Sequence, residues 1–378
     1  MDSFAYTAML AALFRNKINR RIAVYKTHFK LSTMKKSLTY LCAGVFLLLC
    51  AGCGASPFTD NSDALVSAKK DFFAMDTYMS LTAYGERAEE ALSLAENATN
   101  ELERLISTTD ENSEVYKANS GGAAIALSTQ TADIISAALV LCERTNGVLD
   151  ITLYPVVAEW GFTRDVYHVP DGNKLDALLQ NVDYRKVSIE DNKLCLPTGF
   201  MIDLGAIAKG YIADTVTDIM TEHGVFSAIL YFGGDIRVIG SKPDGSPWRI
   251  AIQNPLQSNQ FLGVLGVCDR AVVTSGGYER FFEQDGEAYW HIIDGATGAP
   301  AKSGLISVTV VGETGTLCDG LSTALFVMGA EKALEHQSIH GDFEMVLVTD
   351  QNEVIVTAGL KNGFTLTDTK NYRLVAAE

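Results

Sequence analysis

The fifteen residues from Phe200 to Asp214 constrain the fold of this chain more than any other stretch. An apolar run ends at an acid, Asp203, turns at Gly205, and continues into a helix-like segment that carries Lys209. This pattern predicts a strand that leads into the N-terminus of a helix, where backbone N–H groups face an anion. Lys209 would add a positive charge, and Asp203 could hold a hydroxyl, a ribose or a metal-bound water. The stretch suits a phosphate-bearing ligand, but a glycine at a buried strand–helix turn is equally typical of packing alone.

The N-terminus carries the pattern of an export signal. Residues 34–53 consist of two lysines, a short apolar stretch and small residues that lead to Cys53, which is the order of segments in a signal peptide. The apolar stretch is too short for a stable membrane span. Its ending resembles a bacterial lipobox, although Cys50 stands where leucine is usual. We therefore expect lipidation of Cys53 and a lipid-anchored protein on the extracytoplasmic face of a bacterial cell membrane; an ordinary cleaved signal or an uncleaved anchor is the alternative.

This signal divides the chain into four segments. They are an upstream extension or start-site artefact (1–33), the lipoprotein signal peptide (34–53), a small, polar tether (54–70) and the folded domain (71–378). The last segment is long enough to bury a substantial core, and 47% hydrophobic residues argue against disorder.

The charge of the chain excludes a nucleic-acid partner. Residues 1–52 hold eight of the 30 Lys and Arg and one of the 46 Asp and Glu, so the remainder has 22 basic and 45 acidic residues and a formal charge of −23. Such a surface repels nucleic acid. It would also repel an anionic cofactor, a conflict that a bound divalent metal would resolve.

The cysteines give no metal-binding pattern. Outside the signal, Cys142, Cys195, Cys268 and Cys318 are widely spaced and form no Cys-x-x-Cys pair. We expect buried free thiols, and a disulfide remains an alternative outside the cytoplasm.

Helices and strands are mixed irregularly along the domain. Residues 72–84 alternate as a strand or hairpin, residues 86–106 and 132–142 have helical spacing, and residues 107–119 resemble a polar connection. Further strands are expected over 228–232, 248–252, 262–268, 271–274, 288–293 and 307–311, with a helix over 318–328 and a closing hairpin over 345–357. Without strict βαβ alternation, this order favours an α+β fold with mixed or antiparallel sheets over a doubly wound sheet.

Three further segments have residues suited to chemistry. The turn from Thr274 to Arg280 has hydroxyls and two glycines whose backbone amides could cradle phosphate. His291 and Asp294 flank a Gly/Pro turn, and a histidine there could act as a general base or simply be hydrogen-bonded in the core. Asp319 and Thr323 share one helix face and suit Mg²⁺, although Asp319 could instead cap the helix. The dinucleotide, P-loop, nucleophile-elbow and zinc-protease motifs are absent from the sequence.

Taken in order, these blocks resemble the FAD:protein FMN transferases, the ApbE-like family. The resemblance runs from about Phe72 to the C-terminus. It rests on seven blocks: 75–77, 146–150 with 160–162, 203–211, 233–236, 274–276, 291–300, and Asp319 with Thr323. It implies an ApbE-like, T-fold-related α+β architecture and an enzyme that cleaves FAD with Mg²⁺, attaches FMN through its phosphate to a threonine of a partner protein, and releases AMP.

The resemblance also implies roles for individual residues. Mg²⁺ would lie between the backbone carbonyl of Ala206 and the side chains of Asp319 and Thr323, and His291 or Asp319 would accept the threonine proton. The expected FAD contacts are Met75, Val148, Leu149, Asp150, Asp203, Lys209, His291 and Ile293. The acceptors would be flavin-carrying subunits of Rnf- or Nqr-type redox complexes or other FMN-binding domains.

Departures from the family pattern keep alternatives open. Asp76 replaces a common glycine, Gly295 replaces a proline, and Thr109 stands where many members have an aromatic residue beside the flavin. The last of these bears on whether FMN is transferred or FAD is only hydrolysed. A FAD pyrophosphatase on the same fold and a non-catalytic FAD-binding lipoprotein are therefore the alternatives.

Overall fold

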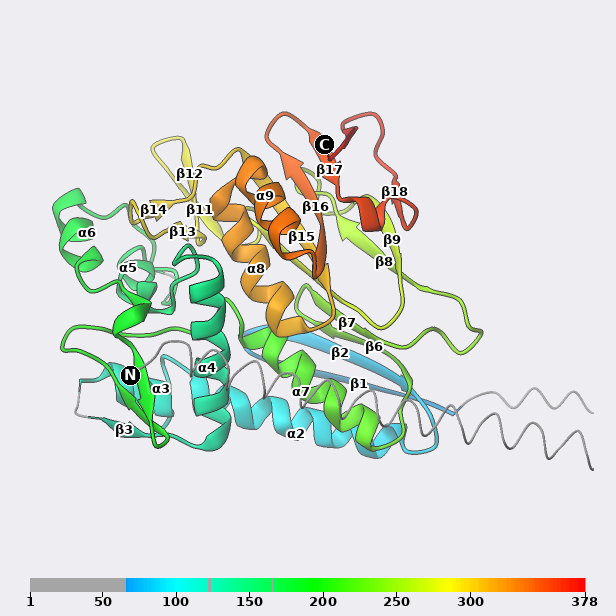
Figure 1. Ribbon diagram of the computed structural model, residues 1–378, viewed down its shortest axis with the longest axis horizontal. Coiled ribbons are helices and arrows are strands. Elements are labelled where there is room, and N and C mark those ends of the chain that lie inside the picture. The colour runs from blue at the N-terminus through cyan, green and yellow to red at the C-terminus, as the bar shows by residue number, and fades with distance from the viewer. Residues whose placement is uncertain (1–65, 122–123, 165, 378) are drawn as a thin grey trace, which may run out of the picture. The chain divides into compact units, whose positions relative to one another are not determined.

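A computed structural model describes residues 66–121, 124–164 and 166–377 (Figure 1), which lie within one compact unit. The predicted signal, the upstream extension and most of the tether lie outside the described residues. The first strand begins at Ser67, four residues before the expected start of the domain. Within the described part of the chain, no helix is long and apolar enough to cross a membrane.

Helices and strands follow one another without a repeating unit. The helices are α2 (Ala88–Ile106), α3 (Glu114–Asn119), α4 (Thr129–Arg144), α5 (Tyr154–Glu159), α6 (Gly172–Leu179), α7 (Ala208–Glu222), α8 (Gly315–Met328) and α9 (Ala330–His340), with short 3-10 turns η1 (Ile151–Leu153), η2 (Tyr184–Lys186) and η3 (Ala358–Leu360). The strands are β1 (Ser67–Ala74), β2 (Thr77–Tyr84), β3 (Ile125–Ala126), β4 (Ser188–Glu190), β5 (Lys193–Cys195), β6 (Ser227–Phe232), β7 (Asp235–Ile239), β8 (Trp248–Gln253), β9 (Phe261–Val267), β10 (Ala271–Gly276), β11 (Phe281–Gln284), β12 (Glu287–Trp290), β13 (Ile293–Asp294), β14 (Ala299–Pro300), β15 (Leu305–Gly312), β16 (Phe343–Thr349), β17 (Glu353–Val356), β18 (Phe364–Leu366) and β19 (Arg373–Ala376).

The main sheet has nine strands in the order β1-β2-β6-β7-β10-β15-β16-β17-β19. Its pairs are antiparallel except for β17 and β19, which run parallel. A three-stranded sheet, β18-β9-β8, and smaller two- and three-stranded sheets complete the described part. The expected α+β class with mixed or antiparallel sheets is confirmed.

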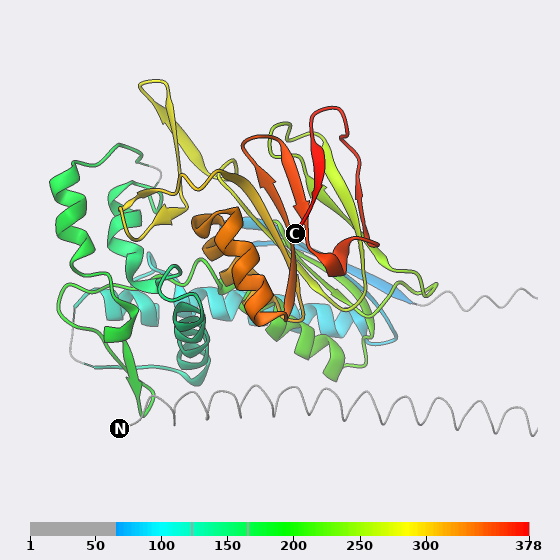
Figure 2. The same ribbon diagram turned by 45° about the horizontal axis from the view of Figure 1, so that its top comes forward.

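The central strands of the main sheet are apolar on both faces because both faces are covered. On β10, Val273 packs with α8 residues such as Leu321, whereas its neighbour Val272 packs with β8 residues such as Trp248. Successive side chains of a strand point to opposite faces, so helices cover one face of the main sheet and the β18-β9-β8 sheet covers the other. In Figures 1 and 2, α2, α7 and α8 lie on the same face of the main sheet.

Most of the elements expected from the sequence form, and the exceptions are local. The hairpin over 72–84 is present as β1 and β2, and the helices over 86–106 and 318–328 are present as α2 and α8. The prediction of a polar connection over 107–119 is wrong, because this segment contains α3, whose N-cap residue is Ser113. The strand expected over 288–293 is divided between β12 and β13.

All four cysteines in the described domain are free. Cys142 and Cys318 are buried as expected, but Cys268 is exposed and Cys195 is only partly buried. The expectation of buried thiols is therefore right for two positions and wrong for Cys268.

Candidate active site

The segment that leads into α7 is extended but is not a strand. Residues 200–204 belong to no sheet, contrary to the sequence prediction. Asn119 at the end of α3 takes the place of a neighbouring strand: its side-chain amide donates to the Ile202 carbonyl and accepts from the Ile202 N–H, both at 2.8 Å. The Asp203 N–H donates to the Ile151 carbonyl at 2.8 Å. These contacts satisfy a buried backbone that would otherwise need a strand partner.

Two glycines let α7 and α8 cross at backbone contact. A Cβ atom on Gly210 would lie 2.2 Å from the carbonyl oxygen of Gly315, and a Cβ on Gly315 would lie 2.5 Å from that of Gly210. Only glycine permits this approach. Asp214, one turn further along α7, accepts from the N–H groups of Gly315 and Thr316 at 2.8 and 2.9 Å. The first turn of α8 is therefore fixed to α7 by backbone contact and by a buried carboxylate.

The crossing gives Asp319 an unusual position. Gly210 is the third residue of α7, so its N–H has no acceptor within the helix, and it donates to Asp319 Oδ2 at 2.9 Å. Ala206 precedes the N-cap residue Ile207, so its carbonyl lies outside the hydrogen-bond ladder of α7. The proposal that Asp319 caps α8 is wrong, because Thr314 is the N-cap residue and Asp319 lies in the second turn.

Thr323 lies one turn after Asp319, and its hydroxyl is placed by β10. The Ser275 hydroxyl is 3.3 Å from Thr323 Oγ1 and 2.7 Å from Ser322 Oγ. The turn from Thr274 to Arg280, a separate candidate in the sequence, therefore contacts the same site through Ser275.

At the Mg²⁺ site that the family resemblance implies, Ser275→Ala is expected to weaken Mg²⁺ binding about tenfold, because Thr323 loses the hydroxyl that orients it. Titration calorimetry with MgCl₂ measures this, and Ser338→Ala on exposed α9 is the control. Equal affinities for the two variants would show that Ser275 does not orient a ligand.

Lys209 is surrounded by acids. Its Nζ is 3.2 Å from Asp235 Oδ2 and 3.9 Å from Asp319 Oδ1. Burial raises the pKa of Asp319 to about 8, in opposition to the Lys209 charge. Burial also raises the pKa of Glu279 to about 7, although Lys209 lowers it. Burial lowers the pKa of Lys209 itself, but the charges of Asp235 and Asp319 outweigh it and raise that pKa above its usual range. Three acids around one ammonium favour the uptake of another cation.

The donors at this crossing fit a hard cation. A backbone carbonyl (Ala206), a carboxylate (Asp319) and a hydroxyl (Thr323) are oxygen donors, the type that Mg²⁺ prefers. Among the residues described by the structure, no group of three or more His, Cys, Asp or Glu side chains is arranged to hold a metal. A site here would therefore depend on the backbone and hydroxyl oxygens as much as on carboxylates.

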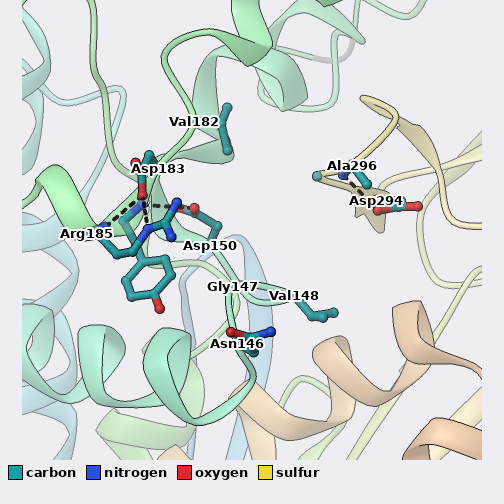
Figure 3. Close-up of a pocket in the computed structure, with 11 residues that line it drawn as sticks. Asn146, Gly147, Val148, Asp150, Val182, Asp183, Arg185, Asp294 and Ala296 are labelled. Atoms are coloured by element: carbon teal, nitrogen blue, oxygen red, sulfur yellow. Dashed lines mark hydrogen bonds and ion pairs between the residues drawn. The ribbon is translucent and has the colours of Figure 1, made fainter.

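A pocket of about 340 Å³ is lined in part by Val148 and Tyr184, which pack on the same core cluster as the start of α7. It is lined by two expected FAD contacts, Val148 and Asp150, and by Asp294. Figure 3 shows Asp294 across the pocket from Asp183 and Arg185. Asp150 accepts from the Thr152 N–H at 2.8 Å and the Tyr184 N–H at 3.0 Å, and burial raises its pKa. The hydrogen bonds from Thr152 and Tyr184 fix the Asp150 carboxylate at the pocket wall.

The other expected FAD contacts differ in accessibility. The side chains of Leu149 and Ile293 are about 5% and 4% exposed and belong to core clusters, so only their backbones could contact a ligand. Met75 has a positive φ of 53° and donates its N–H to Glu103 at 2.8 Å. Asp203 accepts from the Gly205 N–H at 2.9 Å.

His291 is held as a neutral imidazole. Burial lowers its pKa to about 4, and the charges of Arg280 and Lys209 act in the same direction. Its Nδ1 is 3.2 Å from the Arg280 carbonyl oxygen. Because a carbonyl only accepts, Nδ1 carries the proton and Nε2 is the basic nitrogen.

This environment predicts a pH dependence of stability. The folded protein favours neutral His291, so as the pH falls from about 6.5 to 4 the unfolded state takes up a proton that the folded state does not, and stability falls. His291→Gln is expected to reduce the drop in melting temperature over this range. The exposed His168→Gln is the control, and identical pH profiles for wild type and His291→Gln would contradict the burial of a neutral ring.

Sequence patterns alone did not identify several residues of the site. Glu279 and Arg280 lay within the candidate turn from Thr274 to Arg280, and Asp214 ended the stretch from Phe200, but no role was predicted for any of the three. Asp235 belonged to a Gly-Gly-Asp run that is too common to be informative. The charge of Arg280 acts on both Asp203 and His291. A search for charged residues after Gly-rich turns would have found Asp235 and Glu279, but no local signal marks Asp214.

Comparisons with known proteins identify the family of the chain and agree with its fold. A family model described as the ApbE family matches residues 75–347. An FAD:protein FMN transferase of Vibrio cholerae is 35% identical over 248 residues, 62% of this chain and 74% of that protein. One of Salmonella typhimurium is 30% identical over 307 residues, 78% of this chain and 87% of that protein.

Solved structures give the same result. The crystal structure of an ApbE protein from Thermotoga maritima has a TM-score of 0.71 at 29% identity and covers 80% of this chain and 98% of its own. The flavin transferase ApbE from Vibrio cholerae has a TM-score of 0.69 at 28% identity and covers 82% and 98%. The resemblance found in the sequence blocks is confirmed, and the chain belongs to the ApbE family.

Proposed function

We propose that this protein transfers FMN from FAD to a threonine hydroxyl of an acceptor protein and releases AMP. The observation that carries the proposal is the α7–α8 crossing, where a hydrogen bond from Gly210 brings Asp319 to the start of α7, four residues after Ala206, and Thr323 follows one turn later on α8. The names of the relatives support the same reaction. Mg²⁺ held by these three donors would neutralise charge on the pyrophosphate, which phosphoryl transfer requires more than covalent help.

The protein's own residues would bind FAD and accept the proton. In the proposed step, the threonine oxygen bonds to the FMN phosphorus, the bond from that phosphorus to the bridging oxygen breaks, and AMP leaves with that oxygen. The threonine proton goes to His291 Nε2, which is unprotonated at neutral pH, whereas Asp319 already accepts from Gly210. Lys209 would contact phosphate oxygens. Val148, Asp150 and Asp294 at the pocket would hold the nucleotide.

One assay separates transfer from its alternatives. The protein is incubated with FAD, Mg²⁺ and an FMN-binding acceptor domain, and AMP release and acceptor mass are followed. AMP together with a mass gain on the acceptor is expected. AMP without a mass gain would assign FAD hydrolysis, for which Thr109 in place of an aromatic residue is the motivating departure. If no AMP is released, the protein binds FAD without turnover.

We further propose a lipid anchor at Cys53 and acceptors among Rnf- or Nqr-type redox subunits, on the extracytoplasmic side of the membrane. The support is the order of charge, apolar stretch and small residues before Cys53. Cys53→Ser is expected to abolish the incorporation of a labelled fatty acid into the protein in cells, whereas Cys42→Ser within the signal retains it. Incorporation into Cys53→Ser equal to that of wild type would refute the anchor.

A further inference from the structure

Asp235 is a buried acid that the proposed reaction does not use. It begins β7 after a turn in which Gly233 and Gly234 have positive φ angles of 59° and 107°. A Cβ on Gly233 would lie 2.2 Å from Thr77 Oγ1, so the turn is packed closely against β2. Asp235 pairs with Phe232 across the hairpin. Opposite residues share a face, so its side chain points with Phe232 toward the helices, where it is 3% exposed.

The Asp235 carboxylate faces one cation. Its Oδ2 atom is buried and, among the described residues, has no hydrogen bond that meets geometric criteria, but the Lys209 ammonium lies 3.2 Å away. The same ammonium is 3.9 Å from Asp319 Oδ1. Lys209 therefore lies between two carboxylates and is closer to Asp235 than to Asp319, the one at the α7–α8 crossing.

Lys209 and a metal ion would compete for Asp319. An ammonium paired closely with the Asp319 carboxylate would oppose the binding of a divalent cation there, and a partly buried ammonium is stabilised by a counter-ion. Without the Asp235 charge, the nearest anion left to Lys209 among its ion-pair partners is Asp319. We propose that Asp235 is a positioning residue that holds the Lys209 ammonium away from Asp319 and so keeps this carboxylate available to Mg²⁺. This inference rests on the proposed metal site.

A double-mutant cycle tests the role of Asp235 through metal binding, without turnover. MgCl₂ is titrated into the FAD-free full-length protein by calorimetry, and the Mg²⁺-dependent rise in melting temperature is measured in parallel. The variants are Asp235→Asn, Lys209→Met and the two together, with Asp350→Asn on an exposed loop as the control. Asp235→Asn is expected to weaken Mg²⁺ binding at least about tenfold. Lys209→Met binds Mg²⁺ no more weakly than wild type, and the double variant binds within about threefold of Lys209→Met.

The cycle distinguishes an effect of Asp235 that acts through the position of Lys209 from a direct attraction between the Asp235 charge and the cation. If Asp235 acts only through its negative charge, Asp235→Asn weakens binding equally with and without Lys209, which would overturn the proposal. Weaker Mg²⁺ binding by Lys209→Met than by wild type would also overturn the proposal, since it would mean that Lys209 favours Mg²⁺ binding. This comparison does not depend on the folding of Asp235→Asn. If the wild type binds no Mg²⁺, or binds it as Asp319→Asn does, the metal site itself fails and this inference with it.

Discussion

Asp319→Asn is expected to lower Mg²⁺-dependent AMP release more than about 100-fold, because the variant keeps the shape of the side chain but loses the charge that would bind the cation. The amide oxygen can still accept from the Gly210 N–H, so the α7–α8 crossing is retained. Turnover is measured by the release of AMP from FAD at saturating Mg²⁺, with Asp350→Asn as the acid-to-amide control.

Unfolding would not account for such a loss. Burial raises the pKa of Asp319 to about 8, so the metal-free fold prefers the protonated acid, and ionisation costs stability as the pH rises from about 4 to 8. Asn at this position removes that cost. The metal-free variant is therefore expected to melt at the same or a higher temperature than wild type at pH 8. Turnover within about threefold of wild type would remove Asp319 from the metal site.

Gly210→Ala is expected to destabilise the protein by about 2–4 kcal/mol, at or above the upper end of overpacking substitutions. The new Cβ would lie 2.2 Å from the Gly315 carbonyl oxygen and 2.7 Å from Asp319 Cβ, and backbone atoms cannot move aside as a flexible side chain can. The helices must separate, which also breaks the Gly210–Asp319 hydrogen bond. Denaturant unfolding measures the free energy.

Gly172→Ala is the matched control, because it is also a helical glycine. A Cβ there meets nothing within 4 Å, so alanine is expected to leave stability unchanged or raise it by up to about 1 kcal/mol. If Gly210→Ala unfolds at the same denaturant concentration as this control, the close contact between α7 and α8 does not exist in solution.

Local patterns in the sequence predicted much of the fold. The β1–β2 hairpin, α2 and α8 follow from alternation and helical spacing, which depend on residues two to four positions apart. The same spacing placed Asp319 and Thr323 on one face of a helix. The ordered blocks also identified the family before any distance was known.

The run that ends at Asp203 shows where local patterns fail. It was expected to be a strand, and its backbone is extended, but its partner is the side chain of Asn119, 83 residues earlier. An apolar run predicts that a backbone is buried and must be paired. It does not specify whether the partner is a strand or a single amide.

By itself, the sequence determined the family, the α+β class and the residues that carry oxygen and nitrogen donors. The tertiary structure alone decided how those donors are used: Asp319 takes the Gly210 N–H from 109 residues away, Asp214 holds the start of α8, and Asp235 faces Lys209. The physical reason is that the Asp319 and Asp214 contacts depend on two helices crossing at a pair of glycines, whereas the Asp235 contact joins the start of β7 to α7. Such a crossing leaves no periodic pattern in the sequence, because each glycine is required by the close approach of a backbone atom that is distant in the sequence.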